Sequence, residues 1–111
     1  METISFPEFE KVELRAGTIV SVEDFPEAKK PAYKIEVDFG SLGVKKSSAQ
    51  ITSHYSKEQL VGKQIVGVVN IGTRKIGPFT SEFLTTGFPD ENNAVVLISP
   101  DRTVPNGVKL F

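Results

Sequence analysis

Three pairs of adjacent basic residues stand out among the side chains that could do chemistry. The pairs are Lys29-Lys30, Lys45-Lys46 and Arg74-Lys75. Adjacent cations can neutralise the phosphates of a polyanion, and the release of counterions makes such binding salt-dependent. Four aromatic residues occur close to these pairs: Phe25, Tyr33, Phe79 and Phe83. Such rings could stack on unpaired bases, but the same residue types also make ordinary solvated surfaces and cores, so both interpretations stay open.

The charge of the chain is unevenly distributed, although the net charge at pH 7 is only −1. Residues 1–27 contain seven acidic and two basic residues, whereas residues 28–80 contain nine basic and three acidic residues. Residues 81–111 contain four acidic and two basic residues. All three basic pairs therefore fall in one positive central segment, which could present a basic face to a polyanion on a nearly neutral protein.

Catalytic and metal-binding chemistry find little support in the sequence. His54 is the only histidine, and the absence of cysteine excludes disulfides, thiolate catalysis and cysteine-ligated zinc. No HExxH, calcium-loop, P-loop or G-x-S-x-G motif occurs. We expect His54 to be structural or merely exposed. The chain is predicted to be a binding protein without cofactor or metal, not an enzyme.

The length and composition are those of one folded domain. The chain has 111 residues, of which 39% are hydrophobic and 24% charged, which allows one modest core and a soluble surface. No run approaches the roughly 18 apolar residues of a membrane helix. Residues 1–5 lack the basic start and the apolar stretch of a signal peptide. We expect a single cytoplasmic domain over residues 1–111, without membrane insertion.

The basic pairs must be positioned by regular elements, and the first of these that the sequence predicts is a long strand. From Val12 onward every second residue is apolar or small, and this face comprises Val12, Leu14, Ala16, Thr18, Val20 and Val22. A period of two over eleven residues predicts a long, half-buried strand. Gly17 near its middle is the expected place for a bulge or bend, which lets one strand pair in both halves of a small barrel.

The remaining segments complete a barrel pattern. Two capping boxes, Ser5 with Glu8 and Ser56 with Gln59, predict short helices. Further strands are predicted over residues 33–39, 44–52, 64–71, 81–87 and 95–99, and a loop over residues 72–80. Three strands, a short helix and two strands follow the order of the oligonucleotide/oligosaccharide-binding (OB) fold, a five-stranded Greek-key barrel. We predict an all-β OB-fold barrel with a short N-terminal helix, a short helix between strands 3 and 4, and C-terminal extension strands. The basic pairs then fall in regions where this fold binds nucleic acid.

An ordered set of sequence blocks resembles the tRNA-binding domain family. The blocks are Glu13–Val20, Glu23–Ala28, Tyr33–Gly40, Ser47–Thr52, Tyr55, Leu60–Gln64, Val69–Ile71, Arg74–Ile76, Phe79 and Ser81–Glu82. Together they cover about residues 12–109. The family includes CsaA proteins, C-terminal modules of some methionyl- and phenylalanyl-tRNA synthetase chains, and the endothelial monocyte-activating polypeptide. The block Ser47–Thr52 and the short length are most similar to the CsaA branch.

The resemblance implies a non-catalytic, homodimeric module that binds tRNA. It implies that Asn70, Arg74, Lys75 and Ser81 belong to the tRNA-contacting region. With the other basic pairs, the predicted nucleic-acid-binding residues are Lys29, Lys30, Lys45, Lys46, Asn70, Arg74, Lys75 and Ser81. It also implies a dimer interface that buries the N-terminal helix (residues 1–11) and the C-terminal extension (residues 88–111).

The CsaA branch is also associated with protein export, which implies a second function as a chaperone of unfolded precursor polypeptides beside the export machinery. Apolar side chains near the dimer groove would then contact the peptide, and the candidates are Phe79, Phe83 and Phe88. Positions in the core or in the dimer contact are equally open for these three residues. A third alternative is a dimeric interaction domain without a ligand of its own.

Two loops of the chain depart from the pattern of the tRNA-binding modules. Phe25-Pro26 stands where these modules often have His-Pro. Thr73 precedes the basic pair where they often have proline, and Phe83-Leu84 replaces Gly-Met. The departures fall in the loops that would hold RNA and leave the expected fold unchanged.

Overall fold

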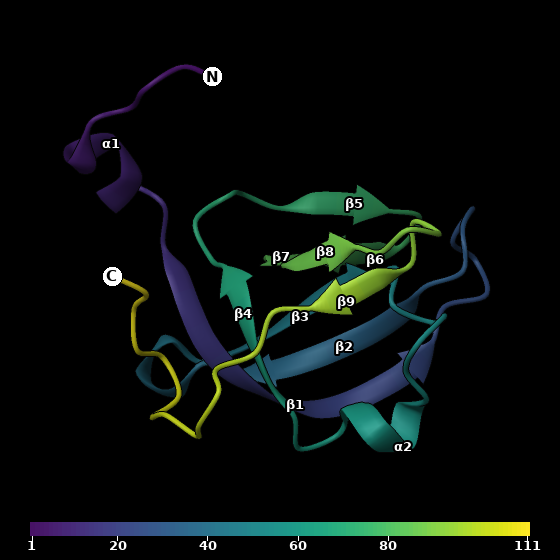
Figure 1. The fold of residues 1–111 in the computed structure, drawn as a ribbon. Helices are drawn as coiled ribbons and strands as arrows, with labels where there is room; N and C mark the ends of the chain where they lie inside the picture. The colour runs from purple at the N-terminus through teal and green to yellow at the C-terminus, as the bar shows by residue number, and fades with distance from the viewer.

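The structure, a computed structural model, describes residues 1–111 as an antiparallel β-barrel with small additions (Figure 1). Its elements are α1 (Phe6–Glu10), β1 (Leu14–Asp24), β2 (Tyr33–Asp38), the 3-10 helix η1 (Gly40–Leu42), β3 (Val44–Ala49), α2 (Lys57–Leu60), β4 (Gln64–Val68), β5 (Arg74–Ile76), β6 (Phe79–Ser81), β7 (Leu84–Thr85), β8 (Gly87–Pro89) and β9 (Val95–Leu97). The main sheet has the strand order β3-β2-β1-β4-β7, and β5–β6 and β8–β9 form two hairpins. This confirms the predicted all-β OB-fold barrel, with a helix between the third and fourth strands.

Strand β1 bends so that it pairs with both halves of the barrel. Its first half pairs with β4, from Leu14 to Thr18, and its second half pairs with β2. The register with β2 shifts between Ile19 and Ser21, which makes Val20 the bulged residue. The bulge lies three positions beyond Gly17, the expected place.

The residues of β1 that face the interior differ from the predicted face, and they change at the bulge. An extra residue in one strand exchanges the faces of all residues beyond it. Before the bulge, Gly17 and Ile19 face the interior, and Ile19 is 0% exposed. At the bulge, Val20 is 47% exposed, although the period of two places it with the buried residues. Beyond the bulge, Val22 packs against the core.

The barrel closes between β3 and the chain that follows β6. The backbone N–H of Glu82 donates to the carbonyl oxygen of Lys46 at 2.8 Å. The hydroxyl of Ser47 donates to the carbonyl oxygen of Phe83 at 2.9 Å, and the N–H of Ser48 donates to Ser81 Oγ at 3.3 Å. Serine side chains thus complete hydrogen bonds that a regular ladder does not supply here, and they fix the end of β6 beside β3.

The hydrophobic core fills the interior of the barrel. Tyr33, Ile35 and Val37 of β2 and Phe39 directly after it are all buried, as the period of two predicts. Strand β4 is buried on both faces, which agrees with its continuous apolar run. Gly17 lies against this core, because a Cβ atom placed there would be 2.6 Å from Val37 Cγ1 and 2.7 Å from Phe39 Cδ1.

Two segments differ from the predicted elements. Residues 72–80, predicted to be a loop, include β5 and most of the β5–β6 hairpin, whose turn contains Gly77 at a φ of 59°. Strands of three residues are too short to show a period of two, so only the turn residues were visible in the sequence. The predicted strand over residues 81–87 is divided between two sheets. Within it, β7 pairs with β4 in the main sheet, whereas β8 begins at Gly87 and pairs with β9.

Both predicted capping boxes are present at the helix starts. Ser5 caps α1 together with Glu8, and Ser56 caps α2 together with Gln59. Helix α1 has no buried residue and stands away from the barrel at the N-terminal end (Figure 1). Neither helix has the length and apolar character needed to cross a membrane.

The close packing at Gly17 predicts that Gly17→Ala lowers the free energy of unfolding. Overpacking of a filled core costs about 1–3 kcal/mol, which exceeds the gain of about 0.4–1 kcal/mol from a less flexible unfolded chain. Urea denaturation of Gly17→Ala, Phe39→Leu and the double variant measures this. We expect Gly17→Ala to cost less in the Phe39→Leu background, because loss of the ring relieves two of the three closest contacts of the added methyl group, while the contact with Val37 remains. An equal cost in both backgrounds would contradict the packing.

Candidate nucleic-acid interface

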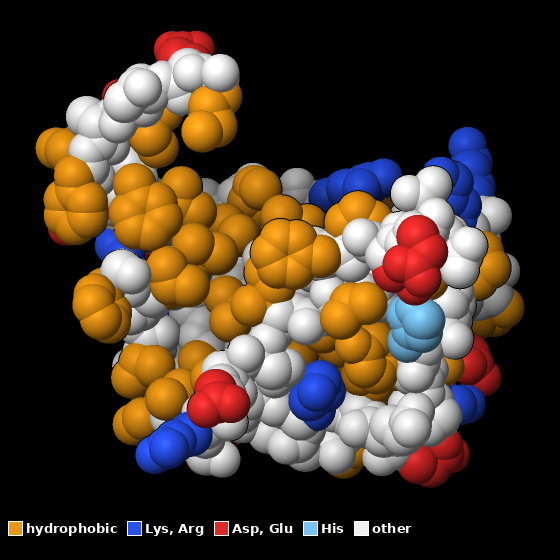
Figure 2. All heavy atoms as spheres, viewed as in Figure 1, with side chains coloured by type: hydrophobic (Ala, Val, Ile, Leu, Met, Phe, Trp, Pro, Cys, Tyr) orange, Lys and Arg blue, Asp and Glu red, His pale blue; other side chains and the backbone are white.

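A groove of about 760 Å³ opens between the β1–β2 loop and the β5–β6 hairpin. Lys29 and Lys30 belong to the loop wall, and Arg74 and Lys75 belong to the hairpin wall. The end of β3 and the start of the chain after β6 complete the lining, with Ser48, Gln50, Ser81 and Phe83. Two basic pairs that are about 45 residues apart in the sequence therefore face one concave surface. Figure 2 shows Lys and Arg side chains gathered at the upper right, over β5 and the β1–β2 loop.

The six predicted basic residues are free of ion pairs. All the salt bridges of lysine and arginine in the structure involve other residues, namely Arg15, Lys34, Lys57, Arg102 and Lys109. The four cations of the groove are also exposed. Glu27 is the one acidic residue among the groove residues. The groove thus carries positive charge that no carboxylate of the chain neutralises by direct contact, and an incoming phosphate would not have to displace one.

The third basic pair is divided between two faces of β3. Lys45 is paired with the inward-facing Val37, and Lys46 with Glu36 on the other face of β2. Lys46 Nζ lies 5.6 Å from the centre of the Phe79 ring, beside the β5–β6 hairpin. Lys45 points away from that side, so the structure brings Lys46 near the groove and does not bring Lys45 there.

Asn70 and Ser81 use their polar groups within the protein. The Asn70 amide accepts from the N–H of Glu13 at 3.0 Å and donates to the carbonyl oxygen of Lys11 at 2.6 Å. It joins the end of β4 to the start of β1 and does not line the groove. Ser81 lies in the groove but is buried, and its hydroxyl bonds to Ser47 and Ser48. These geometries give Asn70 a structural role and make Ser81 part of the groove floor.

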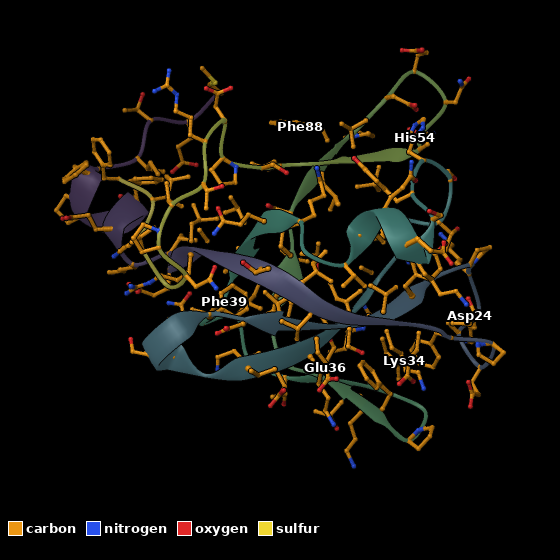
Figure 3. All side chains as sticks on the ribbon, turned by 90° about the horizontal axis from the view of Figure 1, so that it is seen from below. Asp24, Lys34, Glu36, Phe39, His54 and Phe88 are labelled. Atoms are coloured by element: carbon orange, nitrogen blue, oxygen red, sulfur yellow. The ribbon has the colours of Figure 1, made fainter.

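The three phenylalanines predicted for peptide contact lie in three different environments. Phe83 is 3% exposed and packs edge-to-face on Phe39, with ring centres 5.0 Å apart. A core position is one of the alternatives that the sequence left open for Phe83, and it leaves little of the ring accessible to a peptide. Phe79 is half-buried in the β5–β6 hairpin. Phe88 on β8 is 67% exposed and projects from the surface (Figure 3). Its cross-strand partner on β9 is Val96.

His54 contacts an acidic residue of the β8–β9 turn. Its Nε2 lies 2.7 Å from Asp90 Oδ2, while Asp90 Oδ1 accepts from the N–H groups of Asn92 and Ala94. The hydrogen bond from Ala94, followed by that from His54, lowers the pKa of Asp90. No group of three or more His, Cys, Asp or Glu side chains gathers to form a metal site. The pair holds the hairpin to the loop before α2, which is a structural role for His54.

Sequence reasoning missed one contact beside the groove. Phe25, predicted only as a possible stacking residue, is buried and packs against Phe79, with ring centres 5.3 Å apart. Lys34 Nζ lies within about 6 Å of both rings. The outward position of Lys34 in β2 was visible in the alternation of the strand, but its aromatic partners belong to a loop and a hairpin far away in the sequence.

Comparison with known proteins extends over nearly the whole chain. A family model described as "Putative tRNA binding domain" matches residues 14–109. The methionine-tRNA ligase of Pyrococcus furiosus is 34% identical over 110 residues, which are 99% of this chain and 15% of that protein. The methionine-tRNA ligase of Methanococcus aeolicus is 36% identical over 107 residues, again 15% of its length. The chain thus spans about one-seventh of these relatives.

Solved structures of similar size match the fold closely. The chaperone CsaA of Bacillus anthracis is 44% identical, with a TM-score of 0.93 over 99% of this chain and 100% of that one. The CsaA chaperone protein of Picrophilus torridus is 43% identical, with a TM-score of 0.90 over 98% of this chain and 100% of that one. A MetRS-related protein of Pyrococcus horikoshii is 28% identical with a TM-score of 0.87, and the match covers 100% of both chains.

Proposed function

This chain belongs to the family of putative tRNA-binding domains and is of the CsaA type, and from this we propose that it binds tRNA or structured RNA in the groove between the β1–β2 loop and the β5–β6 hairpin. The observation that carries the proposal is the placement of Lys29, Lys30, Arg74 and Lys75, all without ion pairs, on two walls of one groove. The protein acts by binding, without a catalytic step.

The chemistry of the groove suits a phosphate backbone with unpaired bases beside it. Cations on both walls can each neutralise a phosphate, which releases counterions and supplies affinity without sequence specificity. The side chain of Gln50, the hydroxyl of Ser48 and the apolar side chains of Ile71 and Leu84 also line the groove. Amide and hydroxyl groups can bond to base edges or sugar hydroxyls, and apolar side chains can contact the base faces.

Reversal of the two charges on the hairpin should abolish tRNA binding. We expect Arg74→Glu/Lys75→Glu to lose binding, because it replaces two phosphate contacts by two repulsions. Wild-type affinity should fall steeply with salt. In a plot of log K against log salt concentration, each phosphate contact should contribute about 0.9 or less to the downward slope (the salt slope). Fluorescence anisotropy of labelled bulk tRNA, titrated at low and near-physiological salt, measures both effects.

The matched control changes the same total charge outside the groove. Lys45→Glu/Lys63→Glu reverses two cations that have no ion pair, do not line the groove and lie outside α1 and the C-terminal segment. This variant should retain most of the wild-type affinity. Equal losses in both double variants would show that net charge, not the groove, governs binding. No binding by the wild type even at low salt would refute the RNA-binding proposal.

We further propose that the protein forms a homodimer through α1, the C-terminal segment and the β8–β9 hairpin. Seven exposed hydrophobic side chains lie on these elements or directly before α1: Ile4, Phe6, Phe88, Val96, Val108, Leu110 and Phe111. Figure 2 shows hydrophobic side chains over this side of the molecule, from the N-terminal arm to the centre of the view. Contiguous apolar surface of this kind marks an interaction site. A five-residue helix without a buried residue also needs a second surface for its stability.

The dimer proposal predicts that Phe6→Asp yields monomers. Phe6 is 65% exposed on α1, so a carboxylate there harms the folded monomer little but would be buried unpaired in the dimer. Analytical ultracentrifugation of the wild type should give about twice the chain mass of 12.1 kDa, and that of Phe6→Asp about one chain mass. Val20→Asp, at an exposed valine of β1, is the control and should remain dimeric. A monomeric wild type at micromolar concentration would contradict the proposal.

A second candidate function is the binding of unfolded precursor polypeptides in the cytoplasm, in connection with the export machinery. Two similar proteins of nearly the same length are named CsaA chaperones. The exposed pair Phe88 and Val96 on the β8–β9 hairpin supports it, because apolar side chains without a partner can bind the apolar segments of an unfolded chain. Phe79 contributes only the exposed part of its ring.

Peptide binding should depend on Phe88 and tolerate salt. We expect Phe88→Ser to weaken the binding of a labelled, reduced and carboxymethylated polypeptide several-fold, and high salt to have little effect, because burial of apolar surface is not screened. Val20→Ser is the exposed-valine control. Sedimentation of each variant separates loss of peptide contact from loss of the dimer. If the wild type binds neither RNA nor unfolded polypeptide, the chain is an interaction domain without these ligands.

A further inference from the structure

We propose that Phe25 and Phe79 form an aromatic clasp that holds the β5–β6 hairpin to the β1–β2 loop and so sets the spacing of the two basic walls. The clasp is a property of the folded chain, and its effect on RNA rests on the proposed function of the groove. Neither phenylalanine is assigned an RNA contact: they are positioning residues for the cations.

The two rings connect the two walls directly. Phe25 follows β1 at the start of the loop and is 5% exposed, and Phe79 opens strand β6. Their ring centres are 5.3 Å apart with an interplanar angle of 61°, an edge-to-face geometry that aromatic pairs favour. Each ring is four residues from a groove cation, Phe25 from Lys29 and Phe79 from Lys75. A change in this contact therefore moves both walls.

Two lysines of the main sheet fix the clasp to the barrel. Lys34 Nζ lies 5.5 Å from the centre of the Phe25 ring and 6.0 Å from that of Phe79. Lys46 Nζ lies 5.6 Å from the centre of the Phe79 ring. Figure 3 shows Lys34 and Glu36 projecting from β2 toward the side where the hairpin lies. Cations over aromatic faces at these distances are attractive, so β2 and β3 hold the rings through these two lysines.

The hairpin needs such a contact because its own structure is weak. Strands β5 and β6 have three residues each and form a separate two-stranded sheet, which is marginal in water by itself. Hydrogen bonds to β3 hold its base, at Ser81 and Glu82. Phe79 lies two residues nearer the turn at Gly77, where no strand of the main sheet pairs with the hairpin. Without the ring contact, the outer part of the hairpin would open readily.

The clasp is tested first without RNA. Hydrogen–deuterium exchange should be faster in Phe79→Ala than in the wild type, both in the hairpin (residues 74–81) and in the loop (residues 25–32), and unchanged in β2. Phe79→Tyr keeps the ring and should restore slow exchange. Phe79→Leu serves as a milder variant if the alanine variant unfolds. Faster exchange in the hairpin alone, with the loop unaffected, would overturn the clasp.

The effect on RNA separates positioning from direct stacking. If the rings position the cations, Phe79→Ala weakens tRNA binding roughly tenfold and lowers the salt slope by about 1, because one phosphate contact is lost. If Phe79 stacks on a base, affinity falls while the salt slope stays the same, and the positioning role is refuted. Phe25→Leu and Phe79→Leu should be non-additive in affinity, since they break one contact.

The two experiments can refute the clasp and the proposed function separately. A wild type that does not bind tRNA refutes the proposed function, and the exchange data still decide whether the clasp exists. A wild type that binds tRNA, combined with unchanged exchange in Phe79→Ala, refutes the clasp and leaves the proposed function standing. Tyrosine rescue of exchange together with rescue of affinity and salt slope supports both.

Discussion

One strand of this barrel has to pair with a different neighbour in each of its halves, and the rest of the structure depends on how it does so. Strand β1 pairs with β4 through its first half and with β2 through its second half, and the bulge at Val20 supplies the bend. The bend is possible only if the inner surface has room, and Gly17 provides it beside Phe39. The closed barrel then places the β1–β2 loop and the β5–β6 hairpin on the two sides of one groove.

The same architecture separates the charges of a nearly neutral chain. Glu13 binds Arg15 and Lys109, and the hydrogen bond from Lys109, followed by that from Arg15, lowers the pKa of its carboxyl group. Asp24 likewise pairs with Lys57 of α2, and neither residue lines the groove. These acidic residues of the N-terminal segment are satisfied by cations of other elements. The cations of the groove have no ion pair, and they outnumber Glu27, the one acidic residue there, so the local field is positive although the net charge is −1.

The sequence predicted what depends on local pattern and missed what depends on contacts between distant segments. The alternation of β2 and the two capping boxes are local, and they were correct. The position of the bulge depends on how β1 meets two partners, so a period of two could not reveal it. The burial of Phe83 and the hydrogen bonds of Asn70 also arise from distant strands. The alternation of the predicted strand already separates Lys45 from Lys46, but only the fold showed that Lys46 is the one near the groove.

The basic groove and the exposed apolar surface lie on different elements, so RNA binding and dimerisation need not compete. The β1–β2 loop and the β5–β6 hairpin carry the cations, whereas α1, the β8–β9 hairpin and the C-terminal segment carry the apolar side chains. A dimer through the apolar surface would leave both grooves open and hold them at a fixed separation. Two weak sites on one rigid assembly can bind a single large RNA far more tightly than either site alone, if the geometry allows both to engage.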